Sequence, residues 1–224
     1  YLECVDTFVA LTNFARSKFV DAGIPPEKIV VKPNSVTNDP GPGHGEGGYC
    51  LFAGRLSPEK GLGTLLKAWK SIAKTKLVIA GAGPLLADVR KEAANYYGNV
   101  EVLGALQPNE IVALMQGAAC LVLPSEWYEG FPMTVVESYA CGTPVIASNI
   151  GSLSEVVVDG QTGLHFRARD PDDLSRAVNK FMSDRVARQA MRKFARDEFL
   201  NRYSERNNLD ALLKIYSSTL DRYV

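Results

Sequence analysis

The chain of 224 residues is 46% hydrophobic and 22% charged, which is typical of globular protein and enough for one large domain or for a domain with part of a second. It holds 25 basic and 25 acidic residues, so the formal net charge is zero, which argues against binding to duplex nucleic acid. No apolar run approaches the roughly 18 residues of a membrane-spanning helix, no secretory signal is present, and the start at Tyr1 rather than Met is expected for a fragment or a processed form.

The first residues predict a strand–helix–strand unit. Its strands are expected at 7–12 and 28–32, and its helix at 13–21. The segment "NDPGPGHGEGG" at 38–48 then has the glycine and proline content of a linker. We therefore expect a domain boundary in this segment.

After this linker, predicted strands and helices alternate regularly. The strands are short, apolar and β-branched, as in sheets that helices cover on both faces. They are expected at 49–54, 76–81, 100–104, 119–124, 144–148 and 163–166. The helices are expected at 63–72, 84–97, 108–117, 131–142 and 152–158. Pro84 and Pro108 are expected in the first turn of the second and third of these helices, and Gly142 is expected to end the fourth. Consecutive helices are expected in the tail, 171–224. The pattern predicts an α/β fold with a doubly wound parallel sheet and a helical C-terminal tail.

Ligands of such sheets bind outside the carboxyl ends of the strands, so the loops after the strands are the informative ones. In the first of them, "GRLSPEKG", Arg55 leaves the strand and Lys60 stands where the next helix begins. A guanidinium fork and an ammonium on one such loop can converge on a pair of phosphates. The alternative is a pair of solvated surface charges, which their position at the binding edge disfavours.

The glycine turn "GAGPL" follows the strand at 76–81. It lacks the third glycine of a dinucleotide fingerprint, because position 86 is Leu86, and the chain contains no P-loop motif. We interpret the turn as one that lets a helix pack on a strand, with close approach to a ligand as the lesser alternative.

Two carboxylates bracket the segment "EGFPMTVVE", which is predicted to begin a helix near Phe131. The free N–H groups of such a helix start attract anions. Glu129 precedes this start and Glu137 lies about 9 Å beyond it along the axis. Ionised carboxylates accept hydrogen bonds from diols, so the pair suits a ligand with a charged centre and hydroxyl-bearing ends, such as a nucleoside diphosphate sugar. The alternative is that Glu129 caps the helix and Glu137 is solvated.

The cysteines and histidines do not predict a metal site. Cys4, Cys50, Cys120 and Cys141 form no CxxC pair, and the chain has only two histidines, so we expect reduced thiols packed as small hydrophobic side chains in a cytoplasmic protein. No metal and no cofactor are expected.

These motifs resemble the C-terminal half of a retaining glycosyltransferase of family 4 (group 1), whose GT-B architecture pairs two Rossmann-like domains. The family motif is two glutamates separated by seven residues, as in "EGFPMTVVE", followed by "GTPVIAS"; "GRLSPEKG" matches its Arg/Lys loop. Further matches are "LVIAGAGPL", "VEVLGALQPNEI", "DGQTGLHF" and "DPDDLSRAV". The resemblance covers the whole chain and implies a Rossmann-like sheet.

Carried over to matching positions, the resemblance implies these roles. Arg55 and Lys60 bind the donor diphosphate, and Glu129 contacts hydroxyls of the transferred sugar. The residues Gly130, Phe131 and Met133 meet sugar and phosphate through their backbone. Glu137 holds the ribose, and the backbone near Leu106 lies beside the base.

The chain also departs from the family pattern. The joining phrase, usually Asn-Gly-Val-Asp, reads "NSVTND" here, with Ser35 in place of glycine. Residues 1–34 resemble only the last piece of the family's N-terminal domain, and neither His44 nor His165 matches that domain's histidine. The implied organisation is a remnant at 1–34, a linker at 35–48, a nucleotide-sugar domain at 49–203, and a final helix at 204–224 that packs toward the N-terminal domain.

We therefore expect the donor-binding half of a retaining glycosyltransferase that uses a nucleoside diphosphate sugar and an unidentified saccharide, lipid-linked or small-molecule acceptor. Alone it should be inactive or weakly active. The alternatives are a nucleotide-sugar epimerase, a phosphorylase, or a non-catalytic nucleotide-sugar-binding module. The stripe Leu209, Leu212, Leu213 and Tyr216 on the final helix predicts self-association.

Overall fold

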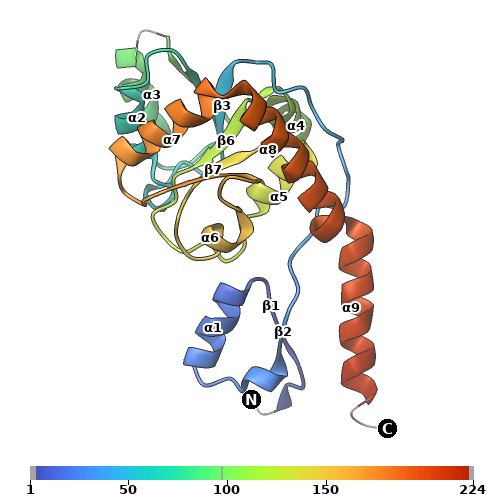
Figure 1. Ribbon diagram of the computed structural model, residues 1–224. Coiled ribbons are helices and arrows are strands. Elements are labelled where there is room, and N and C mark those ends of the chain that lie inside the picture. Colours follow the sequence, from blue (N-terminus) through green and yellow to red (C-terminus); the bar gives the residue numbers. More distant parts are fainter. Residues whose placement is uncertain (1–3, 97, 222–224) are drawn as a thin grey trace.

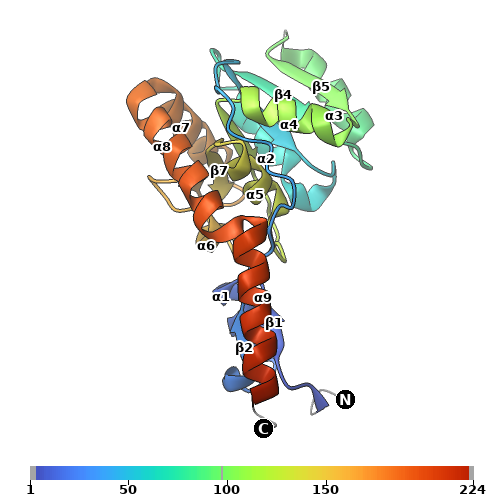
Figure 2. The same ribbon diagram turned by 90° about the vertical axis from the view of Figure 1, so that its right-hand side faces the viewer.

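The computed structural model describes residues 4–96 and 98–221. It shows a large α/β domain, a small unit formed by the first residues, and a long C-terminal helix that runs from the large domain to a position beside the small unit (Figures 1 and 2).

The small unit contains two parallel strands and a helix. Strand β1 (Phe8–Ala10) pairs in parallel with β2 (Ile29–Val31), and helix α1 (Asn13–Asp21) connects them. Thr12 caps α1 by accepting a 3.0 Å hydrogen bond from the N–H of Ala15. A 3₁₀ turn at Pro26–Lys28 leads into β2.

The large domain is built on a parallel sheet of six strands within the described residues, in the order β5-β4-β3-β6-β7-β8. The strands are β3 (Tyr49–Ala53), β4 (Lys76–Ala80), β5 (Val100–Gly104), β6 (Cys120–Leu123), β7 (Val145–Ser148) and β8 (Gly163–Phe166). The order runs outward from β3 in one direction and from β6 in the other, so the switch point lies between these two strands. This confirms the predicted Rossmann-like, doubly wound sheet.

Helices cover both faces of this sheet (Figure 1). They are α2 (Leu62–Trp69), α3 (Leu86–Ala93), α4 (Pro108–Gly117), α5 (Met133–Ala140), α6 (Leu153–Val156), α7 (Pro171–Ser183) and α8 (Arg185–Glu198). Side chains from α2, α3 and α7 pack with one set of strand residues, and those from α4, α5 and α6 pack with the alternate set. Two buried cores result, as the uniformly apolar strands predict.

The segment that connects the two units is held along the surface of the large domain. The Arg196 guanidinium makes a bidentate ion pair with Asp39 at 2.6 Å, and Arg192 donates to the carbonyl of Gly43 at 2.9 Å. The Gln116 amide donates to the carbonyls of Pro40 and Gly41. Despite its glycine content, the segment is therefore fastened at several points.

The chain leaves α8 through a π-helical turn, Phe199–Tyr203, and continues as α9 (Glu205–Leu220). Phe199 and Tyr203 are buried, so this turn is anchored in the large domain. Helix α9 then runs beside the small unit, where the hydroxyls of Thr219 and Thr7 lie 2.9 Å apart (Figure 2). Residues 222–224, which belong to the predicted final helix, lie outside the described residues.

Two predicted helices begin two residues later than expected. Helix α3 begins at Leu86, because Pro84 and Leu85 form a turn in which Leu85 donates to the carbonyl of Leu56. Helix α5 begins at Met133 and not near Phe131, because Pro132 has a ψ of 79°, which is not helical. Gly142 ends α5 with a φ of 63°, as predicted.

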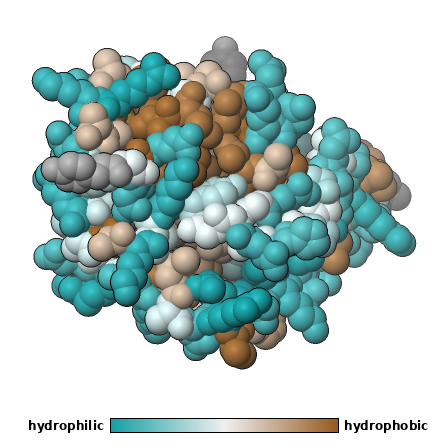
Figure 3. Space-filling view, turned by 90° about the horizontal axis from the view of Figure 1, so that it is seen from above, coloured by the Kyte–Doolittle hydropathy of each residue, from teal (hydrophilic) through white to brown (hydrophobic). Residues whose placement is uncertain are grey.

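The free thiols of Cys50, Cys120 and Cys141 are buried as predicted, but Cys4 is exposed, so it does not pack as a core residue. Viewed from above, the end of the large domain farthest from the small unit carries hydrophilic side chains around a hydrophobic area (Figure 3). No helix among the described residues is both long and apolar enough to span a membrane.

Candidate donor-binding groove

A groove follows the carboxyl ends of β3, β4, β5 and β6, where cavities with shared walls lie side by side. The first, of about 240 Å³, is lined by Lys60, Glu129, Phe131, Pro132 and Met133. Gly54 and Thr134 also line the second cavity, of about 320 Å³, and so join the two. The second cavity is further lined by Arg55, Gly81 and Leu106. Glu137 and Leu106 connect this to a third of about 540 Å³, closed by Val36, Thr37 and Asn38. The groove crosses the switch point, where ligands of doubly wound sheets bind.

At one end of the groove, Lys60 and Glu129 form an ion pair. The Nζ of Lys60 lies 2.7 Å from Oε1 of Glu129, and their side chains are 27% and 21% exposed. The buried Ser125 donates a 2.6 Å hydrogen bond to the same carboxylate oxygen. These contacts fix Glu129 with one oxygen satisfied, while Oε2 makes no hydrogen bond within the described residues.

Arg55 lies in the middle of the groove. Its side chain is exposed and makes no hydrogen bond or ion pair among the described residues. The loop after β3 therefore supplies two cations to the groove, Lys60 to the first cavity, where it is paired with Glu129, and Arg55 to the second. Arg55 also contributes to the lowered pKa of Glu59, although the main cause is the hydrogen bond from Ser57.

The first turn of α5 supplies a backbone donor to the same region. The N–H of Met133 bonds to the carbonyl of Phe131, and that of Val135 to the carbonyl of Pro132. The N–H of Thr134 donates no hydrogen bond within the described residues. Because Thr134 lines the first two cavities, its free amide at the helix start offers a donor to an anion in the groove.

Glu137 stands one turn further along α5, between the second and third cavities. Burial raises the pKa of its carboxyl above the ordinary value. It makes no hydrogen bond or ion pair among the described residues. A half-buried carboxylate without a partner is costly, so a ligand with hydroxyl donors fits this position.

The glycine turn after β4 has a defined packing role. A Cβ on Gly81 would lie 1.8 Å from the carbonyl oxygen of Gly54, and one on Gly83 would lie 2.4 Å from that of Leu56. These glycines let the loops after β3 and β4 touch backbone to backbone. Gly81 also lines the central cavity.

The structure brings most of the predicted site residues into one groove. Arg55, Lys60, Leu106, Glu129, Phe131, Met133 and Glu137 all line it. Gly130 lies on the loop just before Phe131, where its carbonyl accepts a 3.4 Å hydrogen bond from Ser152. Sequence reasoning assigned no role to Ser125 or Thr134. Both carry a signal: Ser125 directly follows the strand predicted at 119–124, in one of the loops expected to be informative, and Thr134 is the second residue after a proline at a helix start.

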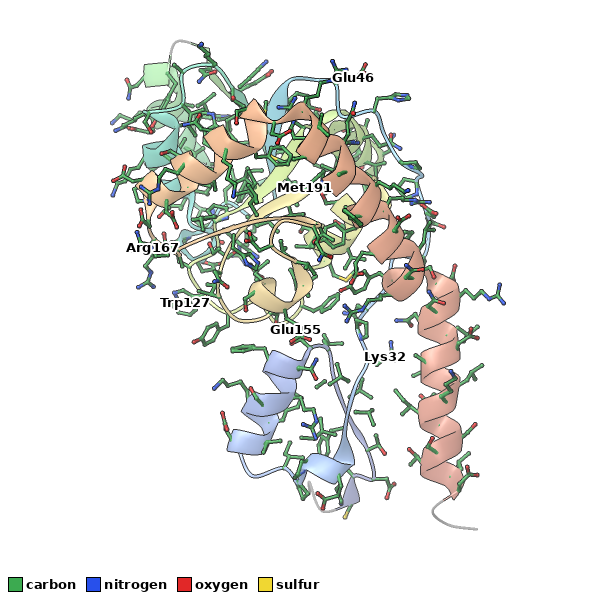
Figure 4. The ribbon with its side chains drawn as sticks, viewed as in Figure 1. Lys32, Glu46, Trp127, Glu155, Arg167 and Met191 are labelled. Atoms are coloured by element: carbon green, nitrogen blue, oxygen red, sulfur yellow. The ribbon has the colours of Figure 1, made fainter. Side chains whose placement is uncertain are left out.

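A second feature without a sequence signal is the joint between the small unit and the large domain. Glu155 on α6 accepts hydrogen bonds of 2.9 Å from the N–H of Asn13, its side-chain amide, and the N–H of Phe14. These two N–H groups are the first of α1, so the carboxylate satisfies orphan donors at the positive end of the helix. Figure 4 shows Glu155 at the edge of the large domain, directly facing α1.

No group of three or more His, Cys, Asp or Glu side chains in the described part of the chain could hold a metal ion. His44 is exposed in the connecting segment, and His165 lies on β8 with a buried Nε2 that has no hydrogen-bond partner.

The family model for glycosyl transferases group 1 matches residues 40–198, most of the chain. The chain belongs to this family. It is 33% identical to the glycogen synthase of Mycobacterium tuberculosis over 174 residues. This aligned region covers 74% of this chain and 41% of that enzyme. It is 28% identical over 217 residues to an uncharacterized glycosyltransferase of Methanocaldococcus jannaschii, which covers 96% of this chain and 60% of the relative.

Solved structures show the same fold. The Anabaena protein HepE in complex with UDP and glucose superposes with a TM-score of 0.84 at 19% identity, over 95% of this chain and 63% of that one. Sucrose-phosphate synthase of Thermosynechococcus elongatus gives a TM-score of 0.85 at 21% identity, over 99% of this chain and 60% of that one. This group 1 glycosyltransferase chain thus spans roughly two fifths to two thirds of the length of the proteins it matches.

Proposed function

We propose that this chain is the donor-binding part of a retaining glycosyltransferase that transfers a hexose from a nucleoside diphosphate sugar. The observation that carries the proposal is the charge order along the groove. Glu129, paired with Lys60, stands in the first cavity, and Glu137 stands between the second and third cavities; Arg55 and the free amide of Thr134 lie between these two carboxylates. A nucleoside diphosphate sugar has the complementary order of hydroxyls, diphosphate and hydroxyls.

In this proposal the diphosphate occupies the centre of the groove. Arg55 and Lys60 face it from one wall and the N–H of Thr134 from the other. Glu137 accepts hydrogen bonds from the ribose, and the base lies beside Leu106. The HepE complex with UDP and glucose supports the same class of ligand in a protein of this fold.

The proposed chemistry is departure of the diphosphate from the anomeric carbon. The bond to the sugar loosens toward an oxocarbenium ion while negative charge grows on the leaving group. Arg55, Lys60 and the start of α5 stabilise that charge because they line the part of the groove where it develops. Glu129, fixed by Ser125, orients the sugar through its hydroxyls. We propose that the leaving phosphate takes the acceptor's proton.

The buried free thiols of Cys50 and Cys120, in which Cys120 donates a 3.4 Å hydrogen bond to the sulfur of Cys50, fit the expected cytoplasmic location. The prediction that no metal is needed also remains part of this proposal.

Calorimetric titration with UDP, GDP and ADP, each with and without an attached hexose, tests the proposal. One nucleoside diphosphate should bind clearly more tightly than its nucleoside, and the hexose should change the affinity only when Glu129 is present. If no nucleoside diphosphate binds more tightly than its nucleoside, the result would contradict both the proposed transferase and the alternative of a non-catalytic nucleotide-sugar-binding module. Transfer by the complete protein would separate those two.

A further inference from the structure

The loop that carries Glu129 is held rigidly on both sides of one exposed indole. Before it, Glu126 donates its N–H to the carbonyl of Glu59 at 2.8 Å, and its carboxylate accepts from Thr64 at 2.8 Å and pairs with Arg169 at 3.2 Å. After it, the ring of Tyr128 packs edge-on against Phe14 of α1, with centroids 4.7 Å apart.

Trp127, between these residues, is 68% exposed and makes no hydrogen bond or ring contact within the described residues. Figure 4 shows it on the rim of the large domain on the side nearest α1. The other tryptophan, Trp69, is 2% exposed and donates its Nε1–H to the carbonyl of Thr75. Trp127 therefore adds nothing to the core and presents its ring to the solvent on the loop that carries Glu129.

The surroundings indicate the chemistry of a partner for this ring. Glu129, two residues away on the same loop, lines the first cavity, which is the position proposed for the donor hexose. An acceptor has to approach that hexose, so a group on this loop lies close to its path. A pyranose ring has one face of C–H groups, and an indole covers such a face.

Trp127 does not line the cavity that contains Glu129. A ring that stacks on Trp127 therefore lies outside the position proposed for the donor hexose. We infer that Trp127 is a stacking surface for a sugar ring of a saccharide acceptor, placed next to the donor hexose. This inference rests on the proposed function and names the class of acceptor.

The chain has only two tryptophans, and Trp69 is buried, so the difference in emission between the unchanged chain and Trp127→Phe reports on Trp127. Maltose, cellobiose and lactose, each titrated to its solubility limit in the presence of UDP, are the saccharide probes. At least one should shift the emission with saturation, and Trp127→Phe should abolish the shift. UDP alone should leave the emission unchanged. Saturation-transfer NMR should show contacts to the ring protons of one sugar face. Trp127→Ala should weaken binding of the saccharide by about tenfold or more.

Control measurements separate the outcomes. Trp127→Ala should bind UDP as the unchanged chain does, which also shows that it folds. If UDP binds but no saccharide alters the emission or the NMR signals, the inference is wrong and the proposed function stands. If UDP-glucose shifts the emission and free saccharides do not, the ring belongs to the donor and the acceptor assignment is wrong. Emission that depends on protein concentration would instead assign the surface to a second copy of this chain. Failure to bind any nucleotide would contradict the proposed function itself.

Discussion

The Nζ of Lys60 and Oε1 of Glu129 lie 2.7 Å apart, so a cation assigned to the diphosphate is paired with the carboxylate assigned to the sugar. This pairing holds both side chains in the groove before any ligand arrives. A bound diphosphate competes with Glu129 for the same ammonium group. The charge on Glu129 is therefore expected to oppose binding of the free nucleotide and to favour binding of the sugar.

Glu129→Gln keeps the size of the side chain and removes its charge. The affinity for UDP should stay near that of the unchanged chain or rise slightly, because Lys60 is then freed for the phosphates. Donor turnover by the complete enzyme should fall by roughly ten to a thousandfold, as for other lost transition-state contacts. Calorimetry and turnover should be measured at one ionic strength. A loss of UDP affinity as large as that caused by Glu137→Ala would make Glu129 a structural cap.

The cation assignment predicts that Arg55→Ala and Lys60→Ala each weaken UDP binding by about 1.5–3 kcal/mol, the range for hydrogen bonds to charged groups. Uridine, which lacks phosphates, should bind each variant as it binds the unchanged chain. Arg185→Ala removes an exposed arginine on α8 that does not line the groove, and it serves as the control. Equal UDP affinity in all variants would rule out phosphate binding by this loop.

The ionised carboxylate of Glu137 should lower the free energy of unfolding at neutral pH. Its folded-state pKa is raised by burial above the usual 4.5, so between these two values the folded chain binds more protons than the unfolded one. The free energy of unfolding should then fall as pH rises through that window. Glu137→Gln should be more stable than the unchanged chain at neutral pH, and this difference should shrink as pH falls below the raised pKa. Urea unfolding across a pH series checks both signs, while UDP affinity should drop in this variant. A pH-independent difference would contradict the burial argument.

The Glu155 contacts predict local rather than global destabilisation when they are lost. Glu155→Gln removes the charge that faces the start of α1, and opening of α1 should become easier by about 1–2 kcal/mol. Hydrogen exchange of the α1 amides should accelerate accordingly. Asp184→Asn provides the matched control, because Asp184 caps α8 through the N–H of Ala187 and lies outside the joint. Unchanged exchange in α1, or an equal change in the control, would show that Glu155 does not hold the small unit.

Helix α9 predicts self-association through one face. Leu209, Leu213, Tyr216 and Leu220 follow one another at helical spacing and are 54–66% exposed. Double substitution of Leu209 and Leu213 by Glu should lower the association constant measured by sedimentation, because burial of this stripe drives the contact. Stability should change little, because α9 buries none of its described residues. A monomeric unchanged chain would contradict the prediction made from the stripe.

The sequence by itself determined the class of sheet and the edge at which the candidate residues lie. Apolar strands such as those predicted at 49–54 and 76–81 require cover on both faces, and parallel strands bring their carboxyl ends to one edge. Arg55, Lys60, Glu129 and Glu137 could therefore be placed together from their positions after strands or at a helix start, without coordinates.

Only the tertiary structure decided which of these groups are paired and which are free. The pairing of Lys60 with Glu129, the free amide of Thr134 and the contact of Glu155 with α1 join residues that are distant in sequence or depend on local backbone angles. Such contacts leave no periodic pattern, because each depends on how loops from different strands fold over one edge. The later start of α5 has the same origin, since the ψ of Pro132 is set by its surroundings and only its φ by its ring.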